Sequence, residues 1–111
     1  MTDHDAPPKP VPTPAQRDEA ASDLLDVRDA IDALDKRIVA LLNERAELGR
    51  AAGRAKAVAG RRAVHDPERE REVLLRVAME NRGPIAQADL LSIYRRIMSA
   101  TRSIESRDRE R

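Results

Sequence analysis

Cysteine, tryptophan and phenylalanine are absent from this 111-residue chain, and Tyr94 is its one aromatic residue. The lack of cysteine excludes disulfide bonds, thiolate catalysis and cysteine zinc sites. With a single aromatic side chain, the protein has too few stacking platforms to bind single-stranded nucleic acid through its bases. Its two histidines, His4 and His65, lie far apart in the sequence and are interpreted as solvated, so we predict no metal site.

The chain also has no excess of charge of one sign. It has 21 Lys and Arg residues against 20 Asp and Glu residues, for a formal net charge of +1. This balance gives no general attraction to nucleic acid or to an acidic membrane surface. No apolar run is long enough to span a membrane, and the N-terminus lacks the apolar core of a signal peptide. We therefore expect a cytoplasmic protein that binds neither nucleic acid nor membranes.

Proline is concentrated near the N-terminus, where five of the seven prolines fall between Pro7 and Pro14. They are interleaved with small and polar residues, a composition typical of disordered segments. The composition predicts a disordered tail over residues 1–20, a folded domain over residues 21–107 and a short C-terminal tail over residues 108–111.

The folded domain has a helical pattern throughout, and no segment alternates with a period of two. We therefore expect an all-α fold with three helices. Ser22 is the expected N-cap of the first helix. Asp66 followed by Pro67 marks the start of the second helix, because proline is favoured at the first helical position. The predicted helices span residues about 22–59, 66–82 and 87–106.

The first predicted helix is too long for a compact monomer. Some 37 residues span roughly 55 Å, whereas a compact domain of about 90 residues is only about 30 Å across. Its apolar positions recur at spacings of three and four, as in helices packed at a shallow angle. A second copy of the chain is the simplest cover for them, so we expect an intertwined helical-bundle homodimer. These positions are Leu24, Ile31, Leu34, Ile38, Leu41 and Leu48.

Polar side chains interrupt the apolar positions of all three helices. A buried charge is costly unless it is paired. One interpretation is therefore that these groups pair with one another, for example Arg45 with Glu70 or Glu105. A second is that long side chains bury their stems and extend their charged ends into solvent. The interrupting or flanking residues are Arg28, Arg45, Lys56, Glu70, Thr101 and Glu105.

A third interpretation is a polar cavity that binds an anion. Arg45 and Lys56 lie on one helix face about 16 Å apart, so two extended side chains can converge on one small ligand. Arg28 lies roughly 25 Å from Arg45 along the same helix and does not comfortably reach that ligand. In an antiparallel dimer, however, Arg28 of one chain can complete the site of the other. Three cations suit a compact dianion, because arginine makes bidentate contacts to carboxylates.

Five motifs follow one another in order: Arg28, "LLNERAEL" with Arg45, "GRAKA" with Lys56, "VHDPEREREVL" with Asp66, Arg69 and Glu70, and "IYRRIMSATRSIE". In this order and spacing they resemble the all-helical chorismate mutases, the AroQ class, over about residues 24–106. The resemblance implies three-helix chains that form an intertwined dimer, with the long first helix contributing to both active sites. Because the chain is short, the resemblance favours a stand-alone, monofunctional mutase.

The resemblance also implies a reaction, the rearrangement of chorismate to prephenate on the route to phenylalanine and tyrosine. This [3,3] shift is unimolecular and requires no nucleophile, metal or cofactor. Catalysis then consists of holding a flexible dianion in its reactive conformation and stabilising the negative charge that develops on the ether oxygen.

By the same resemblance, Arg45 and the Arg28 of the partner chain would bind the two substrate carboxylates. Lys56 would donate a hydrogen bond to the ether oxygen. Glu70, with the backbone of Asp66, would hold the ring hydroxyl. These assignments make Arg45 and Lys56 candidate catalytic residues and the other three candidate binding residues.

Three more residues complete the implied site. Arg69 would orient carboxylates, and Thr101 would occupy a position where the family often has serine and would donate to a carboxylate. Glu105, the third candidate catalytic residue, would face the ether oxygen beside Lys56, where many members have glutamine. A glutamate can donate a hydrogen bond to that oxygen only when it is protonated, so the resemblance predicts that activity falls as Glu105 ionises.

Other functions remain open at this point. Isochorismate-pyruvate lyases share the fold and the cationic pocket, and mutases of 4-amino-4-deoxychorismate would place an amine against Glu70. A non-catalytic helical dimer would use the same charged residues only as ion pairs. Some short mutases are activated by a shikimate-pathway enzyme, and the basic run Arg50, Arg54, Lys56, Arg61 and Arg62 is either such a docking patch or a solvated helix end.

Overall fold

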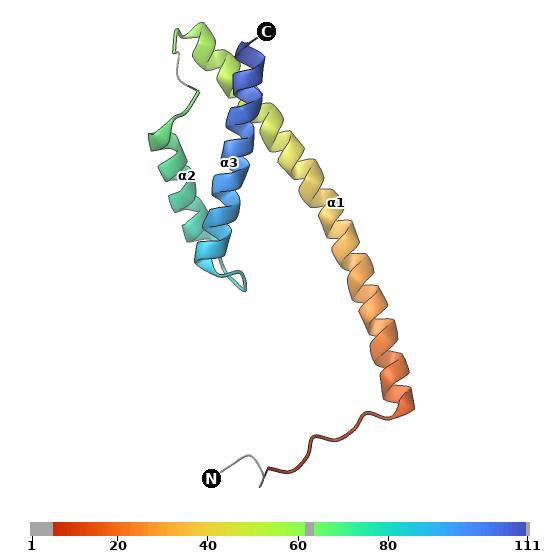
Figure 1. Ribbon diagram of the computed structural model, residues 1–111. Coiled ribbons are helices and arrows are strands. Elements are labelled where there is room, and N and C mark those ends of the chain that lie inside the picture. Colours follow the sequence, from red (N-terminus) through yellow and green to blue (C-terminus); the bar gives the residue numbers. More distant parts are fainter. Residues whose placement is uncertain (1–5, 62–63, 111) are drawn as a thin grey trace. The chain divides into compact units, whose positions relative to one another are not determined.

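The computed structural model describes residues 6–61 and 64–110 (Figure 1). These residues form three α-helices and no strand, which confirms the all-α prediction. The chain divides into two compact units, residues 1–38 and 39–111, and α1 contributes residues to both. His4 lies outside the described residues. The helices are α1 (Pro14–Val58), α2 (Pro67–Glu80) and α3 (Gln87–Arg109).

Helix α1 begins eight residues before the predicted start at Ser22, so the predicted tail over residues 1–20 is too long. The helix starts early because Thr13 and Gln16 form a capping box. The proline-rich composition of this stretch had instead predicted a disordered tail. The Thr13 N–H donates to Oε1 of Gln16 at 2.9 Å, and the Gln16 N–H donates to Oγ1 of Thr13 at 3.1 Å. Pro14 stands between them at the first helical position, where its missing N–H costs nothing.

Helix α1 ends where the sequence predicts, at a glycine. Gly60 has a φ of 79°, the left-handed conformation that glycine adopts without strain. The N–H of Arg61 donates to the carbonyl of Lys56 at 2.9 Å, and the N–H of Gly60 donates to that of Ala57 at 3.0 Å. This pair of bonds is the Schellman motif, which satisfies two of the last carbonyls of the helix. It fixes the end of α1 one turn after Lys56.

Helix α2 begins as predicted, with Asp66 as its N-cap and Pro67 at its first position. The connection from α2 to α3 is organised by Asn81. Its amide donates to the carbonyl of Ile85 at 3.1 Å and to Oε1 of Gln87 at 2.8 Å. Gln87 in turn donates to the carbonyl of Ala78 at 3.0 Å. These bonds tie the end of α2 to the start of α3, and the two helices lie side by side (Figure 1).

Helix α3 supplies most of the buried side chains of residues 39–111, namely Met98, Thr101 and Glu105. Two glycines of α1 face this row. A Cβ atom built on Gly49 would overlap the Thr101 methyl group, and one on Gly53 would lie 3.1 Å from Cγ of Glu105. The close approach of α3 to this part of α1 therefore requires glycine at position 49 and leaves little space for a larger residue at position 53.

Helix α3 continues to Arg109, so the predicted helix end at residue 106 and the predicted start of the tail at residue 108 are wrong. Asp108 explains the extension within the described residues. Its carboxylate accepts from Nε of Arg50 at 2.9 Å and from Nη2 of the same side chain at 3.0 Å. This two-point contact stabilises the last turn of α3 against α1.

In the unit of residues 1–38, the apolar positions of α1 are uncovered. Their side chains are about half exposed, which is unusual for large apolar groups at a regular helical spacing. None of the helices in the described part of the chain is long and apolar enough to cross a membrane. The uncovered side chains include Leu24 at 47%, Ile31 at 49%, Leu34 at 50% and Ile38 at 50% exposure.

Candidate active site

A cavity of about 330 Å³ lies among α1, α2 and α3 within residues 39–111. A volume of this size suits a small organic ligand. Seven of the eight residues predicted for substrate binding line it, and they come from all three helices and from the segment that precedes α2. These seven are Arg45, Lys56, Asp66, Arg69, Glu70, Thr101 and Glu105.

The cavity wall is rich in charge, as an anion site requires. It carries four cationic side chains, of which Arg102 was not predicted, and three carboxylates. Apolar side chains lie among them. The Lys56 and Glu105 side chains are only 19% and 7% exposed, so their interactions are stronger than in water. The apolar lining includes Leu48, Ala52, Val64, Val73 and Met98.

Arg45 is a cation that remains available to a ligand. Its guanidinium carbon lies 6.0 Å from the centre of the Tyr94 ring, at the outer limit of a cation–π contact. Neither Glu70 nor Glu105 forms an ion pair with it in the described part of the chain, although the sequence suggested both. An arginine that forms no ion pair among the described residues is well suited to bind an incoming carboxylate.

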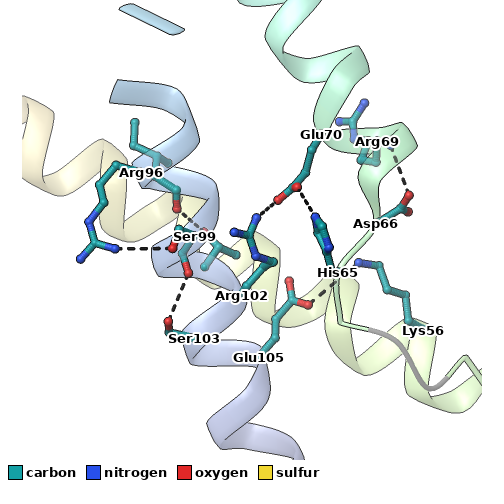
Figure 2. Close-up of polar contacts among 12 residues, drawn as sticks. Lys56, His65, Asp66, Arg69, Glu70, Arg96, Ser99, Arg102, Ser103 and Glu105 are labelled. Carbon is teal, nitrogen blue, oxygen red and sulfur yellow. Dashed lines mark hydrogen bonds and ion pairs between the residues drawn. The ribbon is translucent and has the colours of Figure 1, made fainter. Parts of the chain in front are cut away.

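Lys56 and Glu105 form a pair at the wall between α1 and α3 (Figure 2). Nζ of Lys56 lies 3.9 Å from Oε2 of Glu105, and the Glu105 side chain is only 7% exposed. Among the described residues, no group donates a hydrogen bond to that buried oxygen. A buried polar atom without a partner is costly, so this oxygen is a position where a ligand atom can complete the hydrogen bonding.

Glu70 lies between two donors that the sequence did not connect with it. Oε1 accepts from Nη1 of Arg102, and Oε2 accepts from Nε2 of His65 at 2.8 Å (Figure 2). Because a carboxylate only accepts, His65 must carry its hydrogen on Nε2. Arg102 lies three residues before Glu105 on α3, and residues three apart share a helix face, so this spacing was the available signal. His65, interpreted as solvated, is 58% exposed yet bonded to Glu70.

Asp66 and Arg69 organise the first turn of α2. The Arg69 N–H donates to Oδ1 of Asp66 at 3.2 Å. This backbone hydrogen bond, assisted by the nearby charge of Arg61, holds the pKa of Asp66 below its usual value. The Arg69 side chain donates to Glu72 at 3.0 Å and is more than half exposed, so it lines the rim of the cavity.

Thr101 lies at the buried side of the cavity. Its hydroxyl donates to the carbonyl of Ile97 at 3.2 Å, one turn earlier on α3. A hydroxyl group can rotate and exchange one acceptor for another. Donation to a ligand carboxylate therefore requires that this internal hydrogen bond be released.

Arg28 is the predicted site residue that does not line the cavity. It belongs to the other unit, residues 1–38, and its side chain is exposed. The described residues also contain no group of three or more His, Cys, Asp or Glu side chains that could hold a metal ion.

These features define an all-helical protein with a small ligand cavity whose charged groups converge from three helices. Residues 27–106 match the chorismate mutase type II family, and the chain belongs to that family. Its fold is similar to the chorismate mutase (Form II) structure from Thermus thermophilus, with a TM-score of 0.72 and 30% sequence identity. That likeness covers 76% of this chain and 94% of the Thermus chain.

Two curated relatives combine two activities in their names. The bifunctional chorismate mutase/prephenate dehydratase of Neisseria gonorrhoeae is 40% identical over 82 residues, or 74% of this chain. The enzyme of the same name from Aquifex aeolicus is 39% identical over 89 residues, or 77% of this chain. The chain spans about a quarter of their length, 22% and 24% respectively.

Proposed function

We propose that this protein is a chorismate mutase that converts chorismate to prephenate without a cofactor. The observation that supports this most strongly is the cavity, in which seven predicted residues from the three helices and the segment before α2 surround a space of about 330 Å³. Membership of the chorismate mutase type II family supports the same substrate. In the rearrangement, one carbon–oxygen bond of the ether breaks while one carbon–carbon bond forms within the same molecule.

The proposed roles follow the charges of the cavity. Arg45 binds a substrate carboxylate, because no carboxylate of the described residues occupies its guanidinium. Lys56 donates a hydrogen bond to the ether oxygen, where negative charge develops, and Glu105 in its protonated form donates to the same oxygen. A donor aimed at developing charge in a partly dry site stabilises the transition state more than the ground state. Lys56, Glu105 and Arg45 are thus the proposed catalytic residues.

The remaining residues bind and orient. Glu70 accepts a hydrogen bond from the ring hydroxyl, near the backbone of Asp66, whose carbonyl accepts from the Glu70 N–H at 3.0 Å. Thr101 donates to a carboxylate after its hydroxyl rotates. Arg69, at the rim, steers and orients the anionic substrate.

We also propose that two chains form the functional unit and that Arg28 of the second chain binds the other substrate carboxylate. The half-exposed apolar side chains of α1, including Ile31 and Ile38, support this arrangement, because a second helix would bury them. Arg28 belongs to the same repeat of α1, with spacings of three and four, as these apolar side chains. A second chain would therefore present its own Arg28 on the helix face that the two chains bury together. Sedimentation equilibrium on the full chain tests this, and a monomer at micromolar concentration would contradict it.

The test of the activity is to add chorismate to the purified protein, follow the loss of its ultraviolet absorbance and identify the product by mass spectrometry. Prephenate is the expected product. Lys56→Ala should reduce kcat by about 10²–10³, the usual cost of one donor to developing negative charge, with helix content unchanged by circular dichroism. The matched control is Arg54→Ala, two residues earlier on α1 and outside the cavity lining. A near-normal kcat in folded Lys56→Ala would overturn the site assignment.

A further inference from the structure

Glu70 has both of its carboxylate oxygens engaged by groups from other parts of the chain. Arg102 of α3 donates to Oε1, and His65, from the segment before α2, donates to Oε2 at 2.8 Å (Figure 2). The Glu70 side chain is 20% exposed, and that of Arg102 is 35% exposed. The negative charge of Glu70 is therefore balanced by a cation before any ligand enters the cavity.

This balance decides what Glu70 can recognise. An ionised carboxylate has about four lone-pair directions, so with two in use it still accepts a hydrogen bond from a neutral hydroxyl. A ring amine that carries a proton is a cation. It would meet a carboxylate already paired with a guanidinium, and it would approach that guanidinium as a like charge.

We propose that Arg102 is a specificity-determining residue that acts through Glu70, so that the cavity favours a neutral hydroxyl over a cationic amine on the substrate ring. This inference rests on the proposed function, because it assumes that the ring of chorismate faces Glu70. It identifies chorismate, rather than 4-amino-4-deoxychorismate, as the preferred substrate.

Helix α3 offers a matched control for Arg102. Arg95 lies seven residues earlier, on the same face of the helix. Both arginines line a neighbouring cavity of about 300 Å³, together with His65, Glu70 and Arg71. Only Arg102 also lines the candidate active site and contacts Glu70. Removing the charge at Arg95 therefore changes the local field without changing the partner of Glu70.

The experiment compares the full-length wild type with Arg102→Gln, Arg102→Lys and Arg95→Gln. For each protein, kcat/KM is measured with chorismate and with 4-amino-4-deoxychorismate, and the ratio of the two values is taken. We expect the wild type and Arg95→Gln to prefer chorismate. Arg102→Gln should shift the ratio toward the amine by about tenfold or more, which corresponds to about 1.4 kcal/mol. Arg102→Lys keeps the positive charge and should retain the preference for chorismate.

The possible outcomes distinguish a failure of the proposed function from a failure of the proposed role of Arg102. A wild type that converts neither substrate would contradict the proposed function itself. A wild type that converts chorismate, with a ratio unchanged in Arg102→Gln, would overturn only the role of Arg102. A wild type that prefers the amine would overturn it as well. An equal loss with both substrates in Arg102→Gln would reduce Arg102 to a structural residue, since general damage to the fold does not alter a ratio.

Discussion

The ammonium nitrogen of Lys56 lies 3.9 Å from the buried Oε2 oxygen of Glu105, although the two residues come from different helices. The distance is longer than a hydrogen bond. A ligand oxygen within hydrogen-bond distance of both groups is compatible with this separation. The two side chains are thus placed to act on one ligand atom, and the protonation state of Glu105 decides whether it helps or opposes Lys56.

Glu105→Gln should retain catalysis, whereas Glu105→Ala should lose most of it. A glutamine amide donates a hydrogen bond to the ether oxygen and carries no negative charge to repel the one that develops there. Alanine offers no donor, so we expect kcat of Glu105→Ala to fall by about 10²–10³, the usual cost of one donor to developing negative charge. The measurement is kcat for the wild type and both variants, with chorismate at saturation.

A folded Glu105→Ala with a near-normal kcat would reject this role. Helix content of both variants, followed by circular dichroism, excludes unfolding as the cause of a loss.

Mixing two inactive variants should restore activity if each site draws Arg28 from a second chain. Arg28→Ala retains Lys56, and Lys56→Ala retains Arg28, so a mixed dimer contains one site with both residues intact. After the two variants are refolded together in equal amounts, about a quarter of all sites should be complete, given random pairing in a twofold dimer. The expected result is recovery of about a quarter of wild-type activity, measured by chorismate turnover.

The control is to refold each variant alone, which should give no recovery. A mixture as inactive as the separate variants, in a protein shown to be dimeric, would mean that Arg28 does not complete the site of another chain.

The three helices and most of the candidate site could be predicted because local signals carry them. Pro67 after Asp66 marks the start of α2, and Gly60 marks the end of α1. The burial of Thr101 and Glu105 follows from their place in the apolar repeat of α3. Spacing along each helix determines which side chains share a face, and it collected Arg45, Lys56, Glu70, Thr101 and Glu105. Asp66 and Arg69 were predicted as site residues from the family resemblance alone.

Two kinds of feature could not be predicted: those where two sequence signals disagree, and those set by the distance between two helices or between a helix and a connecting segment. The capping box of Thr13 and Gln16 starts α1 within a proline-rich stretch whose composition predicts disorder. The contact of Glu70 with Arg102 depends on how closely α2 approaches α3, and its contact with His65 depends on the path of the segment before α2. The spacing of residues within one helix determines neither of these.

Gly49→Ala should destabilise the protein, although alanine is the better helix former. The exchange gains up to about 1 kcal/mol in helix propensity. Against this, the new Cβ would overlap the Thr101 methyl group, and overpacking of this kind costs about 1–3 kcal/mol. We expect the free energy of unfolding to fall by about 1–2 kcal/mol on balance, measured by urea titration.

Gly53→Ala is the companion to this variant. Its Cβ would lie 3.1 Å from Cγ of Glu105, a flexible side chain that can move aside. We expect a smaller loss of stability but a reduced kcat, because Glu105 would be displaced. A Gly49→Ala protein at least as stable as the wild type would show that α3 does not need to approach α1 so closely.

Asp66 should make stability depend on pH in the acid range. Its pKa is lowered in the folded protein, chiefly because the Arg69 N–H donates to its carboxylate. A group with a lowered folded pKa stabilises the protein fully above its ordinary pKa of about 3.9 and loses that contribution as the pH falls through the lower folded value. Asp66→Asn still caps α2 but does not titrate. Urea titrations from pH 7 to pH 3 should therefore show a smaller acid loss of stability in Asp66→Asn than in the wild type, and equal losses would mean that the Asp66 charge contributes nothing to the cap.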